Sequence, residues 1–230
     1  MDGAPNQGDS RPPFDTLNLA THVGDDHSQV EQNRSVLVQA IGGAQAGLVA
    51  IGAAHSANVA CVETSEEGVI EGVDGLVTTV PDLALLGLGA DCAVVTFADI
   101  ESGVVAIAHS GWQGLVKGIL SATVHQMCSQ GAAPESIQAH IGPSICGQCY
   151  EVDSERAAQV AAVAPSAVFE SRGKYGIDIA LGAVSQLSEL GVVAISSGEC
   201  TSESTRHFSY RRDGTTGRQG AAIVLRKAPA

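Results

Sequence analysis

The stretch that decides the fold is ADCAVVTFADIESGVVAIAHSGWQGLVKGIL, residues 90–120. It contains two short and nearly continuous apolar segments, CAVVTFAD and GVVAIAHS, which are joined by the polar turn DIES. Both segments are rich in β-branched residues, as buried strands are. If they pair as a hairpin, Cys92 and His109 face each other at its open end. The apolar pattern from Leu115 to Gln130 then predicts one helix, which Gly131 ends.

Strands and helices alternate along the rest of the chain. We expect a strand and a turn at FDTLNLATHVGDD, a helix over 27–41 that Asp26 caps, a helix that Ser154 caps and that ends near Pro165, and a helix from the cap Asp178 to Gly191. Further strands are expected at LVAIG, NVACVE, the second half of VIEGVDGLVTTV, SIQAHIG, VVAIS and AAIVLR. This alternation predicts an α/β fold, a single domain with a mixed, buried β-sheet flanked by helices. Residues 1–13 are expected to form a flexible N-terminal lead, and residues 14–230 the domain.

Composition narrows the function classes. The 230 residues are 44% hydrophobic and 16% charged, which is typical of a globular chain. A formal net charge of −13 repels phosphodiester backbones and anionic lipid, so neither nucleic acid nor a membrane surface is an expected partner. The most apolar stretch is broken by Asp91, Asp99 and Glu101, and the N-terminus lacks the basic and apolar regions of a secretory signal. We therefore expect a cytoplasmic protein whose six cysteines are thiols or ligands.

Three side chains at strand ends predict a metal site. His55 follows LVAIGAA, Cys92 opens the first strand of the hairpin, and His109 closes the second. Neutral imidazole and thiolate are ligands that zinc prefers, and three of them leave a fourth position for water, whose pKa falls to about 7. Two other interpretations stay open at this point. Cys92 and the histidines are ordinary buried or strand-edge residues, or Cys92 is a nucleophile with His109 or His55 as its base.

Two further patterns carry weaker signals. Cys146-Gly-Gln-Cys149 is a C-x-x-C pair in a loop rich in Gly and Pro. One pair cannot close a tetrahedral zinc site, so we interpret these as incidental thiols, and Cys61, Cys128 and Cys200 have no partner at ligand spacing. Half of the twelve cations lie in the last 25 residues, which indicates either a local anion site or a solvated tail strand: Arg206, Arg211, Arg212, Arg218, Arg226 and Lys227.

Taken in order, several blocks of the chain resemble one known family. They are LNLATHVGDD, EQNRSVL, VDGLVTTVPDLAL, ADCAVVTFAD, VVAIAHSGWQGLVKGIL, IGPSICGQCYEV and CTSES followed by FSYRRDGTTGRQ. The chain looks like a member of the laccase-domain family, also called YfiH-like proteins or polyphenol oxidase/purine nucleoside phosphorylase proteins. The resemblance covers residues 14 to 225. Ala53, Ser56 and Gln113 stand where the family usually has Gln, Gly and Arg.

The resemblance implies a single α/β domain that binds one zinc ion through His55, Cys92 and His109, which are also the implied catalytic residues. It implies a purine nucleoside enzyme that cleaves adenosine, inosine and methylthioadenosine with phosphate and that deaminates adenosine. The nucleoside and phosphate are then the small-molecule partners, Arg34 and Arg211 are the expected cations for phosphate, and a monomer is expected. Asp91, beside Cys92, is the nearest carboxylate in the sequence. It is expected to serve either as a proton carrier or as a hydrogen-bond acceptor for a ligand.

Other activities of the family give the alternatives. The first is a Cys–His hydrolase that edits peptidoglycan precursors, and the second is a non-catalytic member whose zinc is structural. Copper is reported for some members that oxidise polyphenols. We rank this activity lowest because multicopper oxidation needs many histidine ligands and the chain has seven dispersed histidines.

Overall fold

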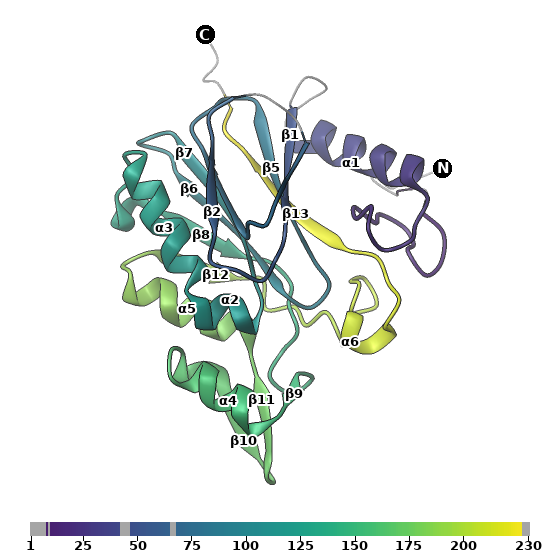
Figure 1. Ribbon diagram of the computed structural model, residues 1–230, viewed down its shortest axis with the longest axis vertical. Helices are drawn as coiled ribbons and strands as arrows, with labels where there is room; N and C mark the ends of the chain where they lie inside the picture. Colours follow the sequence, from purple (N-terminus) through teal and green to yellow (C-terminus); the bar gives the residue numbers. More distant parts are fainter. Residues whose placement is uncertain (1–7, 9, 42–46, 65–67, 227–230) are drawn as a thin grey trace.

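The computed structural model describes residues 8, 10–41, 47–64 and 68–226, and its strands form three sheets (Figure 1). A four-stranded sheet has the order β13-β5-β1-β3, with bounds Gln219–Val224, Leu83–Gly89, Gly47–Gly52 and Gly68–Glu71. A six-stranded sheet has the order β12-β8-β6-β7-β4-β2, with bounds Val193–Ser196, Gln138–Ile141, Ala93–Asp99, Val104–Ser110, Gly75–Thr78 and Val59–Val62. A three-stranded sheet has the order β10-β11-β9, with bounds Val168–Ser171, Lys174–Ile177 and Glu151–Val152.

The hairpin predicted from residues 90–120 is the centre of the six-stranded sheet. β6 and β7 pair antiparallel, with Val94 opposite His109 and Ala93 opposite Ser110. Every residue of β7 is buried, which explains the unbroken apolar run in its sequence. The larger sheets are both mixed, since β1 pairs parallel with β3 and β5 while β13 pairs antiparallel with β5. The predicted α/β class is confirmed, but the buried strands form two packed sheets rather than one.

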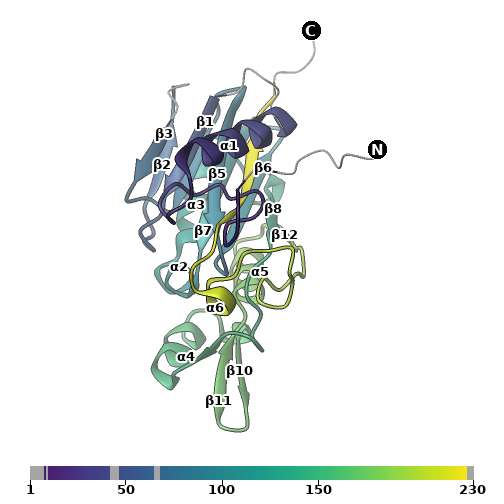
Figure 2. The same cartoon turned by 90° about the vertical axis from the view of Figure 1, so that its right-hand side faces the viewer.

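The helices and the two larger sheets build four layers. The inner faces of the two sheets meet in a cluster that includes Val49, Leu85 and Ile107. The other face of the six-stranded sheet packs on α2, α3 and α5, where Phe97 and Leu120 are fully buried. On the opposite side, α1 lies across the outer face of the four-stranded sheet (Figure 2). Burying a side chain of this size stabilises the fold by about 1.5–3 kcal/mol. Three apolar clusters, one at each interface, therefore hold the four layers together.

The helix bounds agree with the sequence in part. The helices are α1 (His27–Ile41), α2 (Trp112–Lys117), α3 (Ile119–Ser129), α4 (Ser154–Ala161), α5 (Ile179–Glu189) and α6 (Tyr210–Asp213), with short 3-10 turns at Pro134–Ser136 and Pro165–Ala167. The predicted 27–41 helix is confirmed, and the Asp178 side chain caps α5 by accepting the backbone N–H of Leu181. No helix in the described ranges is long and apolar enough to cross a membrane.

Three predicted elements are wrong in detail. The single helix from Leu115 to Gln130 is two helices, because Gly118 adopts a left-handed conformation (φ 81°) that ends α2 and starts α3. The segment 14–26 contains turns and no strand, since the buried Asn18 side chain bonds the backbone of Ala20 in place of a neighbouring strand. The cap of α4 is Asp153 rather than Ser154, and that helix ends at Ala161. Most of the expected N-terminal lead lies outside the described residues.

A small lobe projects from one end of the sandwich. It consists of α4 and the three-stranded sheet, and both views show it below the two larger sheets (Figures 1 and 2). The loop of residues 142–150 leads into this lobe from β8, and the chain returns through α5 and β12 to the tail that carries α6. The loop and the tail meet at Asp91, before β6, where the N–H of Ile145 donates to its carbonyl and the N–H of Arg211 donates to its carboxylate.

Candidate metal centre

His55, Cys92 and His109 converge at the open end of the hairpin. His55 lies in the loop after β1, Cys92 directly precedes β6, and His109 lies near the end of β7. One ligand atom of each residue lies within 4.8 Å of the ligand atoms of the other two. The rings of His55 and His109 have centroids 5.0 Å apart. Residues that are 17 to 54 positions apart in the chain thus form one group that could hold a metal ion.

Asp74, in the turn before β4, fixes the orientation of His109. Its Oδ1 atom lies 2.9 Å from His109 Nδ1, and the backbone N–H of His109 donates to the Asp74 carbonyl at 2.8 Å. This contact leaves Nε2 as the nitrogen that is free to bind a metal. Burial lowers the pKa of His109, but the hydrogen bonds to Asp74 and Cys92 outweigh it and raise this pKa to about 9, so a metal ion that binds Nε2 displaces a proton.

The same carboxylate holds the loop of His55. Oδ2 of Asp74 accepts the backbone N–H groups of Ala54 (3.1 Å) and Ser56 (2.6 Å) and the Ser56 hydroxyl (2.7 Å), while Oδ1 accepts the N–H of His55 (3.1 Å). Burial raises the pKa of Asp74, but the hydrogen bonds from His109, Ser56 and Ala54 more than offset it, so the pKa lies well below its usual range. Asp74 is therefore a buried anion that positions both histidines.

The surroundings of His55 favour the neutral form that a metal ligand needs. Burial and the nearby His109 lower the pKa of its imidazole. Its backbone is in the left-handed region (φ 52°), which is uncommon for a residue other than glycine, and the Asp74 contacts and the Lys117 ammonium on its carbonyl hold it there. The loop therefore presents an exposed, neutral imidazole beside the buried His109.

Gly111 allows Cys92 to approach the histidines. A Cβ atom at residue 111 would lie 2.6 Å from Cys92 Sγ, which is closer than two unbonded atoms can come. The backbone of Gly111 is ordinary extended chain (φ −94°), so glycine is needed here for space rather than for conformation. The thiol side chain thus occupies the position that a side chain at residue 111 would fill.

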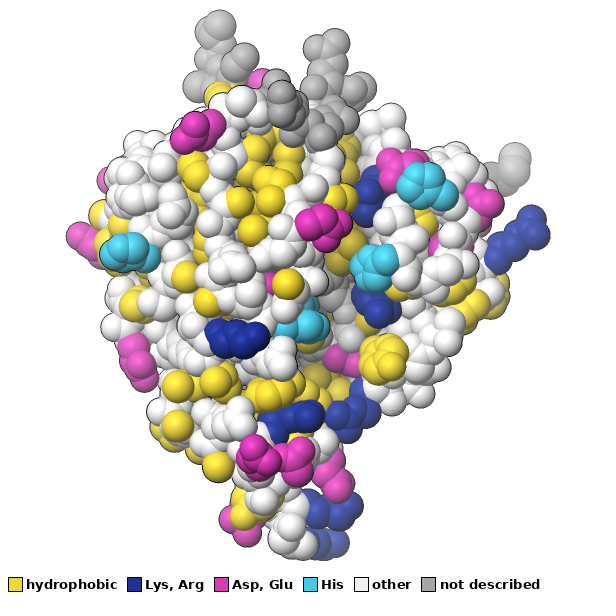
Figure 3. All heavy atoms as spheres, in the orientation of Figure 1, with side chains coloured by type: hydrophobic (Ala, Val, Ile, Leu, Met, Phe, Trp, Pro, Cys, Tyr) yellow, Lys and Arg dark blue, Asp and Glu magenta, His cyan; other side chains and the backbone are white. Residues whose placement is uncertain are grey.

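The group lies in a pocket of about 700 Å³. The residues predicted to bind substrate, Arg34 and Arg211, line this pocket together with the three candidate ligands. His22, to which the sequence assigned no role, and Arg218 of the basic cluster also line it. The space-filling view shows histidine and cationic side chains on both sides of a hollow at the centre of this face (Figure 3). A chain of net charge −13 therefore concentrates cations at one site.

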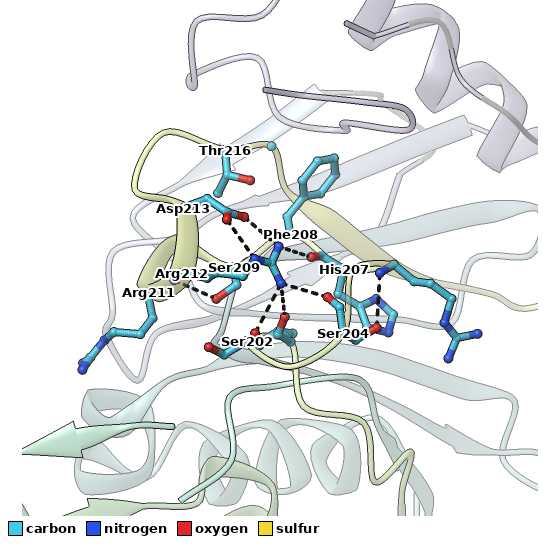
Figure 4. A network of polar contacts seen from close by, with 12 residues as sticks. Ser202, Ser204, His207, Phe208, Ser209, Arg211, Arg212, Asp213 and Thr216 are labelled. Atoms are coloured by element: carbon cyan, nitrogen blue, oxygen red, sulfur yellow. Dashed lines mark hydrogen bonds and ion pairs between the residues drawn. The ribbon is translucent and has the colours of Figure 1, made fainter. Parts of the chain in front are cut away.

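Most of the basic tail serves the fold rather than a ligand. The Arg212 guanidinium donates to the carbonyls of Thr201, Ser204 and His207 and pairs with Asp213 (Figure 4). Arg206 pairs with Glu199, and Arg226 donates to the carbonyl of Ile41. Of this basic cluster, Arg211 and Arg218 are the members that line the pocket within the described residues. The cluster is thus neither a single anion site nor a solvated strand.

The structure overturns one of the two roles expected of Asp91 and the isolation expected of Cys200. The Asp91 carboxylate does not bond to a candidate ligand. It accepts the Thr201 hydroxyl and the N–H of Arg211 instead, each at 2.7 Å. Asp74 is the carboxylate that accepts a hydrogen bond from a candidate ligand, His109. Cys200 is not without partners, because the tail brings it to Cys146 and Cys149.

The chain is similar to several known proteins. Residues 4–226 match the family model described as multi-copper polyphenol oxidoreductase laccase. A purine nucleoside phosphorylase of Streptomyces coelicolor is 44% identical over 221 residues, which are 95% of this chain and 91% of that protein. An adenosine deaminase from an unknown prokaryotic organism is 34% identical over 96% of this chain and 91% of that protein.

Solved structures with the same fold are also similar. The crystal structure of the hypothetical protein YfiH of Bacillus licheniformis has a TM-score of 0.89 at 30% identity and covers 96% of this chain and 90% of that chain. YlmD from Geobacillus stearothermophilus has a TM-score of 0.89 at 33% identity, over 97% of this chain and 90% of that chain.

Proposed function

The chain belongs to the multi-copper polyphenol oxidoreductase laccase family of YfiH-like proteins, and from this we propose that it is a zinc-dependent purine nucleoside enzyme. Its reactions are the phosphorolysis of adenosine, inosine and methylthioadenosine and the deamination of adenosine. The observation that carries the proposal is one pocket that contains a His–Cys–His group, several aromatic rings and several arginines. The relatives named for purine nucleoside phosphorylase and adenosine deaminase activity support it.

The donor set fits zinc. His55, Cys92 and His109 offer two imidazole nitrogens and one sulfur, and the Asp74 carboxylate on His109 Nδ1 is the kind of contact that orients a ligating histidine. Three protein donors are the number that catalytic zinc sites use. The bound ion supplies Lewis-acid chemistry at the floor of the pocket. Everything else in the reaction depends on how the chain holds the nucleoside and the phosphate.

The aromatic residues of the pocket suit a purine base. The sequence has one Trp and three Tyr, and three of these four residues line the pocket: Trp112, Tyr150 and Tyr210. Tyr210 is 63% exposed at the pocket wall, so its ring is free to stack on a flat base. The Tyr150 ring already carries the Arg211 guanidinium at 4.9 Å. A chain with 3% aromatics thus places most of its flat, polar-edged rings around one site.

The arginines of the pocket suit phosphate. Arg34 is anchored by its Nε on the carbonyl of Leu19, and Arg211 by its Nη1 on the carbonyl of Glu151. Arg218 bonds the carbonyls of Thr216 and Gly217 through Nη1 alone. These anchors fix each guanidinium group and leave other N–H groups for an anion. In phosphorolysis, a phosphate oxygen bonds to C1′, the C1′–N bond breaks, and the purine leaves with the bonding electrons and takes up a proton.

Product analysis tests the proposal directly. Zinc-loaded protein is incubated with adenosine, inosine or methylthioadenosine, with and without phosphate, and the products are separated by chromatography. We expect free base and the pentose 1-phosphate only when phosphate is present, and inosine with ammonia from adenosine in either case. If fully zinc-loaded protein forms none of these products, the proposal is rejected.

Arg218→Met is expected to raise KM for phosphate by about 10- to 100-fold with little change in kcat. Hydrogen bonds to a charged group contribute about 1.5–3 kcal/mol, and methionine keeps an unbranched apolar stem but removes the guanidinium group. The measurement is phosphorolysis of inosine at varied phosphate. Arg11→Met, at an exposed position that does not line the pocket, is the matched control and keeps the wild-type KM. An unchanged KM in Arg218→Met would remove this residue from the proposed phosphate site.

Gly111→Ala is expected to lower kcat/KM by about 100-fold. The new methyl group would lie 2.6 Å from Cys92 Sγ and therefore displaces it. A misplacement of about 1 Å in a catalytic site lowers the rate by about 100-fold. The measurement is zinc affinity together with kcat/KM. Gln113→Ala, two residues along in α2, is the control because it removes atoms rather than adding them. Wild-type zinc affinity in Gly111→Ala would show that Cys92 is not a ligand.

One observation favours a second candidate function. The contacts Cys92–His109 and His109–Asp74 form a nucleophile–base–acid arrangement, as a Cys–His hydrolase that edits peptidoglycan precursors requires. This function needs no metal, so complete chelation separates the two. Hydrolysis of a muramyl amino acid amide that survives chelation would favour the hydrolase, and loss of nucleoside turnover on chelation favours the zinc enzyme.

Polyphenol oxidation ranks lowest, because the described residues bring two histidines together at one potential metal group.

A further inference from the structure

The loop of residues 142–150 and the tail that follows β12 run side by side. Ser144 and Cys200 form a parallel β-bridge. The N–H of Ser144 donates to the carbonyl of Glu199 at 3.2 Å, and the N–H of Thr201 donates to the carbonyl of Ser144 at 3.1 Å. These bonds fix two segments that lie more than 50 residues apart in the sequence. They place Cys200 beside the C-x-x-C pair, which no spacing in the sequence indicated.

Four metal-ligating side chains meet where these segments pair. They are Cys146 and Cys149 from the loop and Cys200 and Glu203 from the tail, and their ligand atoms all lie within 4.8 Å of one another. Around a tetrahedral zinc ion with Zn–S bonds of about 2.3 Å, neighbouring sulfur atoms lie about 3.8 Å apart. Small side-chain rotations therefore suffice to close the group on an ion. The group is separate from the pocket, since none of its members lines it.

Both segments have the backbone of a metal-binding turn. Each contributes two ligands separated by two residues, as C-x-x-C in the loop and C-x-x-E in the tail. The carbonyl of Cys146 accepts the N–H groups of Cys149 (3.1 Å) and Tyr150 (3.0 Å), and the carbonyl of Cys200 accepts the N–H of Ser204 (3.1 Å). The N–H of Cys146 also donates to Cys200 Sγ at 3.4 Å, a contact that orients a thiolate ligand.

A hydrogen-bonded network around Arg212 keeps the tail turn in this shape. Arg212 Nη1 donates to the carbonyls of Thr201 and Ser204 at 2.9 Å each, so it holds the peptide groups on both sides of Glu203 (Figure 4). The Ser209 hydroxyl accepts the N–H of Arg212 and sets the start of α6. The turn that supplies Cys200 and Glu203 is therefore ordered before any ion binds, as a preformed site requires.

We propose that Cys146, Cys149, Cys200 and Glu203 bind a second zinc ion at a structural site. Three sulfur donors and a carboxylate favour zinc over magnesium or calcium, which prefer oxygen. Four protein ligands fill a tetrahedral shell, so this ion stabilises the fold and is closed to substrate. It ties the loop that ends in Tyr150 to the tail that carries Arg211, and both of these residues line the pocket. A disulfide would use two of the three thiols and give Glu203 no role.

Zinc content per chain tests this site without any measurement of activity. The protein is loaded with zinc ions under reducing conditions, freed of excess ion, and analysed by elemental mass spectrometry. We expect two zinc ions in the wild type, one in Cys92→Ala, one in Cys146→Ala and none in the double variant. Cys128→Ala, a partly buried cysteine of α3 outside both groups, is the control and retains two.

Cobalt substitution assigns the second ion to its ligands. Cobalt-loaded Cys92→Ala is expected to show the strong thiolate-to-cobalt charge-transfer bands and the visible absorption of a tetrahedral site, because three sulfur donors remain. Glu203→Gln keeps the three thiols and the fold, and is expected to lose its second zinc at a chelator concentration that leaves the wild type with two. A wild-type zinc content that Cys146→Ala retains in full, or a disulfide among these cysteines in the reduced, folded protein, would overturn the proposal. One zinc in the wild type that Cys92→Ala keeps and Cys146→Ala loses would instead reject only the pocket site.

Discussion

Replacing Cys92 with alanine is expected to remove one zinc ion per chain and to lower kcat/KM for nucleoside by about 10³-fold or more. Cys92 is the only sulfur donor of the His55–Cys92–His109 group. The two remaining imidazoles hold the ion poorly. A metal ion in a catalytic site stabilises the transition state by several kcal/mol, and about 1.4 kcal/mol corresponds to a tenfold change in rate. The measurements are elemental analysis and steady-state kinetics on the same preparation.

The zinc content of Cys92→Ala distinguishes the zinc-dependent nucleoside enzyme from the Cys–His hydrolase. A purely nucleophilic Cys92 also predicts lost activity, but it predicts an unchanged zinc content. Cys61→Ala is the matched control, since Cys61 is a partly buried thiol in β2 that belongs to neither potential metal group of the described residues. Activity lost with full retention of zinc in Cys92→Ala would contradict the metal role and favour the Cys–His–Asp interpretation.

Asp74→Asn is expected to weaken zinc binding by about 10- to 100-fold and to destabilise the fold. Changes to the groups that orient metal ligands have an effect of this size on affinity. In either orientation of the amide, its NH2 group meets two of the N–H groups that Asp74 accepts, so buried donors lose their partner. Each such donor costs about 1–3 kcal/mol. Zinc competition assays and urea unfolding measure the two effects.

A second buried aspartate tests whether Asp74→Asn acts on the position of the metal ligands or on the stability of the whole fold. Asp99, which is 2% exposed at the far end of the same hairpin, accepts the backbone N–H groups of Glu101, Ser102 and Ala133. Asp99→Asn is therefore expected to destabilise the fold and to leave zinc affinity unchanged. If Asp99→Asn weakened zinc binding as much as Asp74→Asn does, the effect at Asp74 would be one of general stability.

The sequence predicts the hairpin well because its signal is local. Two runs of small and β-branched residues on either side of a four-residue polar turn have few other ways to be buried, and β6 and β7 pair as expected. The helix after them was predicted as one element because the apolar period continues through Gly118. Only the left-handed conformation of that glycine divides α2 from α3, and an apolar pattern does not report a backbone dihedral angle.

The candidate site divides in the same way. His55, Cys92 and His109 lie at the ends of apolar runs, so residue type and position suggested them together. Asp74 was missed because its role depends on the pairing of β4 with β7, which places Gly75 opposite Ala108 and hence Asp74 beside His109. Cys200 and Glu203 were missed for the same reason, since the bridge to Ser144 is a long-range contact. Long-range pairings of this kind leave no period in the sequence.

The most direct measurement is anomalous diffraction at the zinc absorption edge from crystals of the zinc-loaded protein. The account predicts a peak about 2.0–2.3 Å from Cys92 Sγ and from one ring nitrogen each of His55 and His109. Zinc-loaded crystals with no peak between these three side chains, or with Cys92 Sγ turned away from an ion held by other residues, would contradict it.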